Sequence, residues 1–139
     1  MKKQRGFTLI ELLVVIAIIG LLSTLAVVAL NNARMKSRDA KRVSDIKQIQ
    51  TAVELYYNDA NAYPATVTSG SPIIYDTVTY MAEVPTNPSP ENDGTCVDDN
   101  AYTYTMTDLG ASYTLQYCLG GTTGGVDPGT NTAYPGGIK

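Results

Sequence analysis

The chain has 139 residues, enough for one domain, and its 44% hydrophobic content is ordinary for a folded protein. It contains no His, no Trp and two Cys. Because imidazole serves most acid–base, nucleophilic and transition-metal sites, this composition argues against a hydrolase triad, a zinc finger or a haem site. We therefore expect a protein that is not an enzyme.

Charge is divided unevenly along the sequence. Nine of the ten basic residues lie at or before Lys47, on either side of an apolar run. From Gln48 onward, one basic residue faces ten acidic residues. This acidic part repels nucleic-acid phosphates, so no specific nucleic acid is predicted as a partner. The basic residues at 34–47 are interpreted as a solvated helix face beside a membrane, with attraction of DNA or anionic lipid as the alternative.

Residues 7–30 form an apolar run of 24 residues whose only charge is Glu11. As a helix, this run would measure about 36 Å, which is enough to cross a hydrocarbon core of about 30 Å. A secretory signal has a shorter apolar core, of about 7–15 residues, followed by a small-residue cleavage site. The run is therefore predicted to be a retained transmembrane helix. Basic residues flank both of its ends, so charge alone leaves the orientation open.

The helix is predicted to continue beyond the membrane. Over residues 31–63, apolar side chains recur every three or four positions, which is the period of an amphipathic helix. They are Ala40, Val43, Ile46, Ile49, Val53, Tyr56 and Ala60. No Pro precedes Pro64, and Gly20 is the only Gly between Phe7 and Tyr63. We expect one helix from Phe7 to about Ala60.

After Pro64 the pattern changes from helical to alternating. Residues 102–106 and 113–117 alternate large apolar with polar side chains on either side of a turn, which predicts a β-hairpin. One face of the resulting small antiparallel sheet should pack on the helix between Val43 and Tyr56. The Gly-rich tail 120–137 is expected to be a loop. Two segments are weaker candidates for strands or short helices: Ile73–Tyr75 and Val78–Tyr80.

Glu11 needs an explanation, because a carboxylate near the centre of a membrane helix costs about 2.5–3.5 kcal/mol, and less near its end. One interpretation is that its side chain reaches the membrane interface and has no further role. The other is that it pairs with a positive charge on a neighbouring helix. A cut before Phe7 would create such a charge, because a new amino terminus would appear four residues from Glu11.

Cys96 and Cys118 are either free thiols or a disulfide. If the distal domain is exported, it meets oxidising conditions, and a bond is then favoured. Such a bond would stabilise a small domain by roughly 3 kcal/mol in the chain-entropy model. We predict the disulfide, which would tie an Asp-rich loop to the second strand of the hairpin.

The N-terminal sequence KKQRGFTLIELLVVIAIIG, from Lys2 to Gly20, resembles the prepilin N-terminus shared by type IV pilins and the pseudopilins of type II secretion systems. This resemblance implies cleavage between Gly6 and Phe7 by a prepilin peptidase on the cytoplasmic side of the membrane. It also implies N-methylation of Phe7 and a role for Glu11 as the assembly carboxylate. The orientation follows from the same resemblance, with the leader inside the cell and the distal domain outside.

The family resemblance also implies an architecture. We expect an α+β, pilin-like fold, in which a long N-terminal helix, membrane-spanning in its first half, packs on a small antiparallel β-sheet. The expected parts are a cleaved leader (1–6), a transmembrane and assembly half of the helix (7–30), an amphipathic half (31–63) and a β-sheet head with a Gly-rich tail (64–139).

The function implied is that of a structural subunit of a helical pilus or pseudopilus filament. The expected partners are further copies of the chain, the prepilin peptidase, an assembly ATPase, an inner-membrane platform protein and, before assembly, membrane lipid. The subunit would first sit in the cytoplasmic membrane and then in an extracellular or periplasmic filament. The alternatives are a monomeric membrane-anchored binding module and a minor pilin for adhesion or DNA uptake.

Calcium is the one cofactor considered, because major pseudopilins have a calcium site in their distal loops. The candidate ligands in this sequence are Asp93, Asp98, Asp99 and Asp127. Their spacing does not match an EF-hand, whose ligands alternate around a Gly and end in a Glu. A solvated acidic loop is therefore the expectation, with calcium as the alternative.

Overall fold

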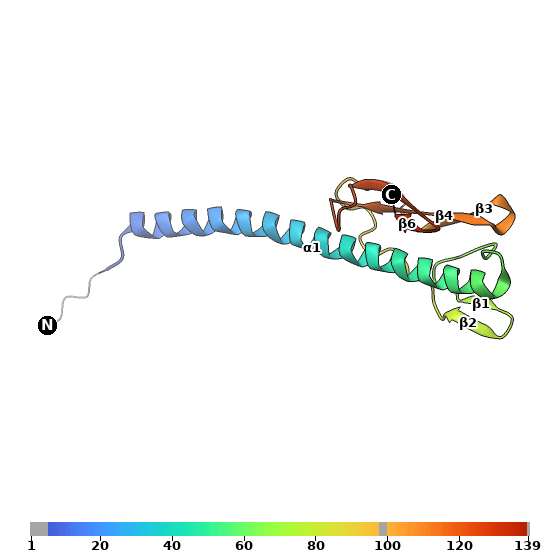
Figure 1. The fold of residues 1–139 in the computed structure, drawn as a ribbon. Coiled ribbons are helices and arrows are strands. Elements are labelled where there is room, and N and C mark those ends of the chain that lie inside the picture. Colours follow the sequence, from blue (N-terminus) through green and yellow to red (C-terminus); the bar gives the residue numbers. More distant parts are fainter. Residues whose placement is uncertain (1–5, 98–99, 139) are drawn as a thin grey trace. The chain divides into compact units, whose positions relative to one another are not determined.

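The computed structural model describes residues 6–97 and 100–138. The chain divides into two compact units, Met1–Arg34 and Met35–Lys139, each of which is described by itself. The helix α1 (Leu9–Ala60) begins in the first unit and ends in the second (Figure 1). The predicted long helix is confirmed: it begins at Leu9, two residues after Phe7, and ends at Ala60, as expected.

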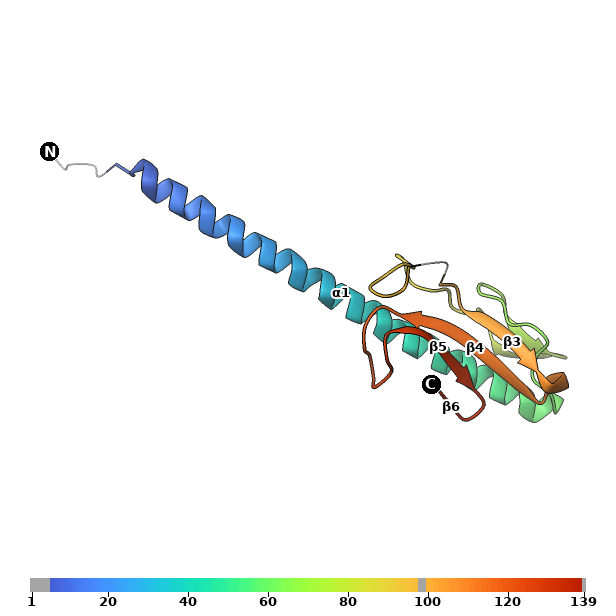
Figure 2. The same cartoon turned by 90° about the horizontal axis from the view of Figure 1, so that it is seen from above.

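The second unit, here called the head, contains two antiparallel sheets. A two-stranded sheet pairs β1 with β2, and a four-stranded sheet has the order β3-β4-β5-β6 (Figure 2). The α+β, pilin-like class is confirmed. The strands are β1 (Ile73–Tyr75), β2 (Val78–Met81), β3 (Thr103–Thr107), β4 (Ser112–Leu119), β5 (Gly129–Tyr134) and β6 (Gly137–Ile138).

The predicted hairpin is β3 and β4. Tyr104 pairs with Leu115 and Met106 with Tyr113, which is the register that places their alternating side chains together. The connection is the short 3-10 helix η1 (Asp108–Gly110), whose residues have φ values of +52°, +56° and +92°. The weaker strand candidates are also confirmed, as β1 and β2.

The expectation that residues 120–137 form a loop is wrong. Strand β5 pairs along β4, with Leu115 opposite Ala133 and Leu119 opposite Gly129, and β6 extends the same sheet. Ladder hydrogen bonds are made by the backbone, so β5 needs few apolar side chains to join an existing edge. Gly124 and Gly125, which precede β5, lie where the chain turns and have φ of +61° and +81°.

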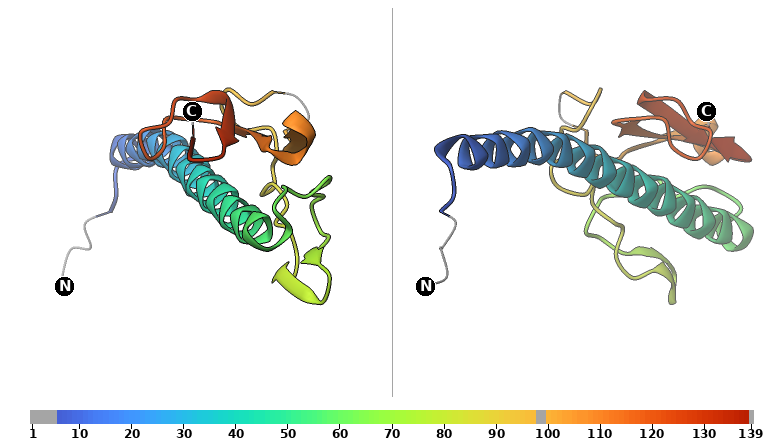
Figure 3. Two further views of the ribbon diagram at one scale, coloured as in Figure 1. Left: turned by 45° about the vertical axis from the view of Figure 1, so that its right-hand side comes forward. Right: turned by 90° about the vertical axis from the view of Figure 1, so that its left-hand side faces the viewer.

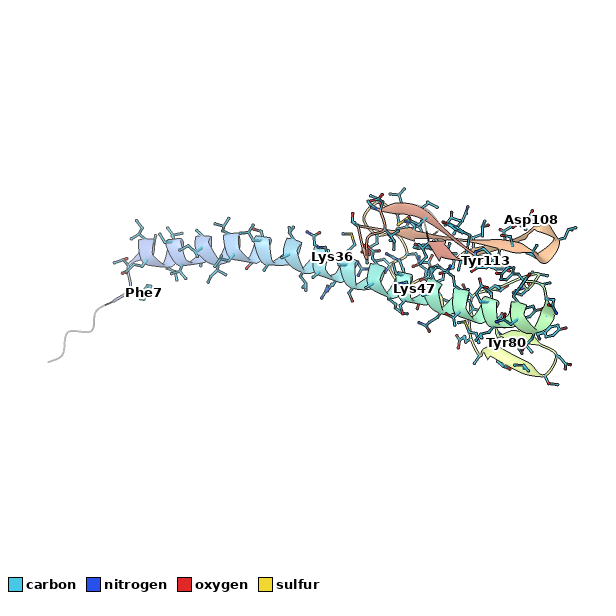
Figure 4. The ribbon with its side chains drawn as sticks, in the orientation of Figure 1. Phe7, Lys36, Lys47, Tyr80, Asp108 and Tyr113 are labelled. Atoms are coloured by element: carbon cyan, nitrogen blue, oxygen red, sulfur yellow. A yellow bond between two sulfur atoms is a disulfide. The ribbon has the colours of Figure 1, made fainter. Side chains whose placement is uncertain are left out.

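The core lies between α1 and the four-stranded sheet, as predicted. Tyr113 of β4 lies between the two layers (Figure 4) and is fully buried. The β1–β2 hairpin lies on the other side of α1 (Figure 3). The buried apolar cluster comprises Ile46, Ile49, Ala52, Val53, Tyr63, Ile73, Val84, Tyr102, Tyr113, Leu115, Tyr117, Leu119 and Ala133.

The buried face of α1 differs from the predicted apolar stripe at its start. Ala40 is exposed, whereas Asp39, Arg42 and Asp45 are buried. The buried face thus continues toward the N-terminus at helical spacing, but with charged instead of apolar residues. An apolar pattern cannot find such positions, because each charge is accepted in the interior only through its partners.

Asp45 is one of these buried charges. It is 5% exposed, and its Oδ2 accepts a hydrogen bond from the Tyr102 hydroxyl at 3.1 Å. Burial raises the pKa of Asp45, although the Tyr102 hydrogen bond and the charge of Lys41 act in the opposite direction. The folded state therefore binds this proton more tightly than the unfolded chain. The resulting stabilisation is complete below the unfolded carboxyl pKa of about 3.9 and is lost as pH rises through the folded pKa.

We therefore expect Asp45→Asn to raise the thermal midpoint of the full chain by a few degrees at neutral pH. The amide oxygen still accepts the Tyr102 hydrogen bond, and the buried charge is gone. The gain should shrink under acidic conditions, where Asp45 is protonated in both states. The exposed Asp76→Asn is the control and should change little. A lower midpoint for Asp45→Asn at neutral pH would show that the ionised carboxylate stabilises the head.

Candidate processing and assembly site

Thr8 and Glu11 close the N-terminal end of α1. Glu11 Oε2 accepts hydrogen bonds from the Thr8 backbone N at 2.8 Å and from Thr8 Oγ1 at 2.6 Å. In return, the Glu11 backbone N donates to Thr8 Oγ1 at 3.3 Å. This reciprocal pair is a capping box, which satisfies free amides at a helix start and explains why α1 begins at Leu9. Sequence reasoning missed it, although Thr-x-x-Glu before an apolar run is its signature.

The predicted cleavage point lies directly before this cap. Gly6 and Phe7 precede α1 and are exposed, with Phe7 79% exposed. In the described part of the chain, nothing apart from the neighbouring residues lies within 4 Å of the Cβ that a larger residue would place at Gly6. The peptide bond between them is therefore accessible. The leader residues Lys2, Lys3 and Arg5 lie outside the described residues.

The first unit exposes its apolar side chains on every side of the helix (Figure 4). None of the most apolar 18-residue window is buried, and α1 is long and apolar enough to span a membrane. Each exposed Val, Leu or Ile forgoes about 1.5–3 kcal/mol of burial, so lipid or protein must cover this segment. The exposed large side chains include Leu9, Ile10, Leu12, Leu13, Val14, Ile16, Ile18, Ile19, Leu21, Leu22, Leu25, Val27 and Val28.

The predicted disulfide is confirmed. Cys96 and Cys118 are bonded, with Cα atoms 5.9 Å apart and a sequence separation of 22. Cys96 also exchanges backbone hydrogen bonds with Asp93, at 2.9 and 3.0 Å. The bond thus ties the segment that carries Asp93 to strand β4, the second strand of the predicted hairpin.

Two of the four calcium candidates, Asp93 and Asp127, lie among the described residues. The Asp93 carboxylate lies 2.5 Å from Arg38 Nε and 3.7 Å from Arg42 Nη1. Asp127 is exposed, and its backbone oxygen accepts from Asn131. Asp98 and Asp99 lie outside the described residues. Among the residues that are described, no three His, Cys, Asp or Glu side chains are grouped as a metal site.

The interpretation of residues 34–47 as a solvated basic face is wrong for Arg42. Its side chain is fully buried and its Nη1 lies 2.7 Å from Asp39 Oδ1, on a carboxylate that is also fully buried. Arg38 is 22% exposed and pairs with Asp93, which raises the pKa of Arg38. Lys36, Lys41 and Lys47 are exposed, as expected. The signal that sequence reasoning missed is the Asp39–Arg42 pair at i, i+3, in phase with the buried face.

The N-terminal segment thus combines a capped apolar helix with a solvent-accessible peptide bond directly before it. Residues 1–27 match the family model described as the prokaryotic N-terminal methylation motif, and the match includes Gly6, Phe7 and Glu11. The resemblance to type IV pilins and pseudopilins that Lys2–Gly20 predicts is thereby confirmed for this segment.

Among curated proteins, this chain is similar to Type II secretion system core protein G from several bacteria. It is 47% identical to the Escherichia coli K12 protein over 64 residues, or 46% of this chain and 44% of the relative. It is 35% identical to the Vibrio cholerae protein over 92 residues, or 66% of this chain and 58% of the relative. It is also 41% identical over 54 residues to a fimbrial protein of Pseudomonas aeruginosa, or 39% of this chain and 35% of the relative.

The chain spans about half the length of the curated relatives that it matches. No solved structure matches it. The family-model match covers residues 1–27, which fits anchoring of the chain in a membrane by α1.

Proposed function

We propose that this chain is a structural subunit of a helical type IV pilus or type II secretion pseudopilus filament, polymerised through α1 after cleavage between Gly6 and Phe7. The observation that carries this proposal is the exposed apolar segment of α1, which follows an accessible Gly6–Phe7 bond and matches the methylation motif. Relatives named as a secretion-system core protein and as a fimbrial protein support a filament. The precursor sits in the cytoplasmic membrane with its head outside.

In this proposal, the peptidase removes residues 1–6 and leaves Phe7 with a charged amine, which is then methylated. An assembly ATPase and a platform protein move the subunit from lipid into the filament. Helix–helix contacts between copies then replace the lipid around α1. The positive end of the helix favours a carboxylate in its first turn, and in the filament Glu11 pairs with the Phe7 amine of a neighbouring copy.

Processing is tested on the full-length precursor in membranes with a prepilin peptidase. We expect a loss of mass equal to residues 1–6, and a block of that loss by Gly6→Leu, because a bulky side chain replaces hydrogen at the scissile bond. Gly6→Ala is the matched control and should be processed with a milder defect. Efficient processing of Gly6→Leu, or cleavage elsewhere in the wild-type chain, would contradict the proposed site.

Filament formation separates this function from its main alternative, a monomeric membrane-anchored binding module. The processed chain should sediment as filaments in a reconstitution with the assembly ATPase and platform protein. A processed chain that stays monomeric under those conditions would favour the binding module.

A further inference from the structure

The guanidinium of Arg42 is surrounded by oxygen atoms. Its Nη1 lies 2.7 Å from Asp39 Oδ1 and 3.7 Å from Asp93 Oδ2. Its Nε donates to Asn87 Oδ1 at 2.8 Å. Its Nη2 donates to the backbone oxygens of Pro90 at 3.1 Å and Glu91 at 3.4 Å. The Arg42 side chain has no exposed surface, so this group is a buried charge held by its partners.

These oxygens come from separate parts of the head. Asp39 lies on α1, and its carboxylate also accepts the backbone N–H groups of Gly120 at 3.0 Å and Gly121 at 2.9 Å, at the end of β4. Asn87, Pro90, Glu91 and Asp93 belong to the segment between β2 and β3. Arg42 and Asp39 therefore hold that segment, α1 and the end of β4 together.

The oxygen set has the chemistry of a calcium site. Calcium binds carboxylate, backbone carbonyl and side-chain amide oxygens, six to eight in number, and all three kinds are gathered on Arg42. An arginine can serve the same oxygens, because its planar guanidinium offers five donors and a permanent positive charge. The site thus has the oxygen ligands of a bound cation, and the guanidinium of Arg42 is the cation that they surround.

We propose that Arg42 is a built-in cation, which takes the place of a divalent ion among the oxygens of the 87–93 segment and orders it without metal. The proposal has a direct consequence. Truncating the side chain should open a place that calcium can fill, because two carboxylates and three neutral oxygens would then face it. Asp39 would stay in position through its bonds to Gly120 and Gly121.

The test uses the full chain in detergent micelles, with thermal unfolding followed in a calcium chelator and in millimolar calcium chloride. The wild-type midpoint is expected to be the same in both. Arg42→Ala should unfold well below wild type in the chelator and recover by about 5 °C or more in calcium, with an apparent Kd on the order of 10⁻⁴–10⁻³ M. Magnesium, which demands a tighter octahedral site, should recover little.

Arg42→Met is the matched control, because Met fills part of the same space without charge. It should lose stability and show no response to calcium. In Arg38→Ala/Arg42→Ala, Asp93 loses its second cation, so calcium should bind more tightly than in Arg42→Ala. Arg38→Ala alone should not respond to calcium.

Two results would overturn the proposal. A wild-type midpoint that rises with calcium would show that the head still needs a metal in the presence of Arg42. An Arg42→Ala chain that is unstable, or does not fold, equally with and without calcium would show that calcium cannot take the place of Arg42 among these oxygens. Neither outcome bears on filament assembly, so the proposed function is tested separately.

Discussion

Replacing Glu11 with Ala is expected to leave a subunit that is folded, exported and processed but enters filaments poorly. Processing leaves a charged amine on Phe7, and a filament without Glu11 would bury that amine with no carboxylate near it. Breaking one half of a buried ion pair costs about 3–5 kcal/mol, more than keeping or deleting both halves. Such a cost corresponds to roughly two to four orders of magnitude in the equilibrium constant for subunit addition.

The capping box supplies a second reason for a defect, which must be separated from the first. Glu11 accepts two hydrogen bonds from Thr8, and loss of a helix cap costs about 1 kcal/mol by itself. Thr8→Ala removes the hydroxyl half of the cap, leaves the backbone N that donates to Glu11 and keeps the carboxylate, so it should assemble nearly as well as wild type. Glu11→Gln keeps an oxygen that can accept from Thr8 and removes the charge, so it should assemble as poorly as Glu11→Ala.

The measurement is filament yield in cells that lack wild-type subunits, with mass spectrometry of the membrane fraction to show that each variant is processed. Equal yields for Glu11→Ala and wild type would mean that Glu11 only reaches the membrane interface. If Thr8→Ala failed as severely as Glu11→Ala, with Glu11→Gln normal, then helix capping and not charge would explain the requirement for this residue.

The parts of the fold that follow from local periodicity were predictable. Helix α1 has no Pro and consists of a continuous apolar run followed by a stretch with a helical apolar period, and the β3–β4 hairpin alternates strongly about its turn. The site residues Gly6, Phe7 and Glu11 came from a motif that lies contiguous in sequence. The Cys96–Cys118 disulfide could be predicted because the chain has two cysteines, both in a domain that is expected to lie outside the cell.

What could not be predicted depends on partners far away in sequence. Strand β5 forms because its backbone pairs with the edge of β4. Residues such as Thr130 and Thr132 show no apolar alternation of their own. Arg42 is buried because Asn87 and Pro90, more than 40 positions away, supply its oxygens. Judged from its neighbours in sequence alone, Arg42 belongs to a run of basic residues and is expected to face water.

Removing the disulfide is expected to lower the thermal midpoint of the head by roughly 12 °C or more. In the chain-entropy model, a cross-link over this sequence separation stabilises by about 3 kcal/mol, and 1 kcal/mol shifts the midpoint of a small domain by roughly 4–8 °C. The loop that it closes contains β3, the η1 turn and most of β4. Without it, the segment of Asp93 and Cys96 keeps its hydrogen bonds at the end of β4, such as Thr95 N to Gly120 O at 3.2 Å, and the ion pair of Asp93 with Arg38.

Cys118→Ser combines two effects, because Cys118 is only 4% exposed and a Ser hydroxyl placed there would also need a partner. Cys96→Ala/Cys118→Ala removes the cross-link without adding a polar group, so its loss of stability measures the bond more directly. Reduction of the wild-type chain should lower the midpoint by a similar amount, whereas the double variant should not respond to reductant. Two free thiols in the non-reduced wild-type protein, or an unchanged midpoint after reduction, would contradict the prediction. A Cys118→Ser chain that is much less stable than the double variant would instead assign part of the loss to the buried hydroxyl, since the cross-link is absent from both.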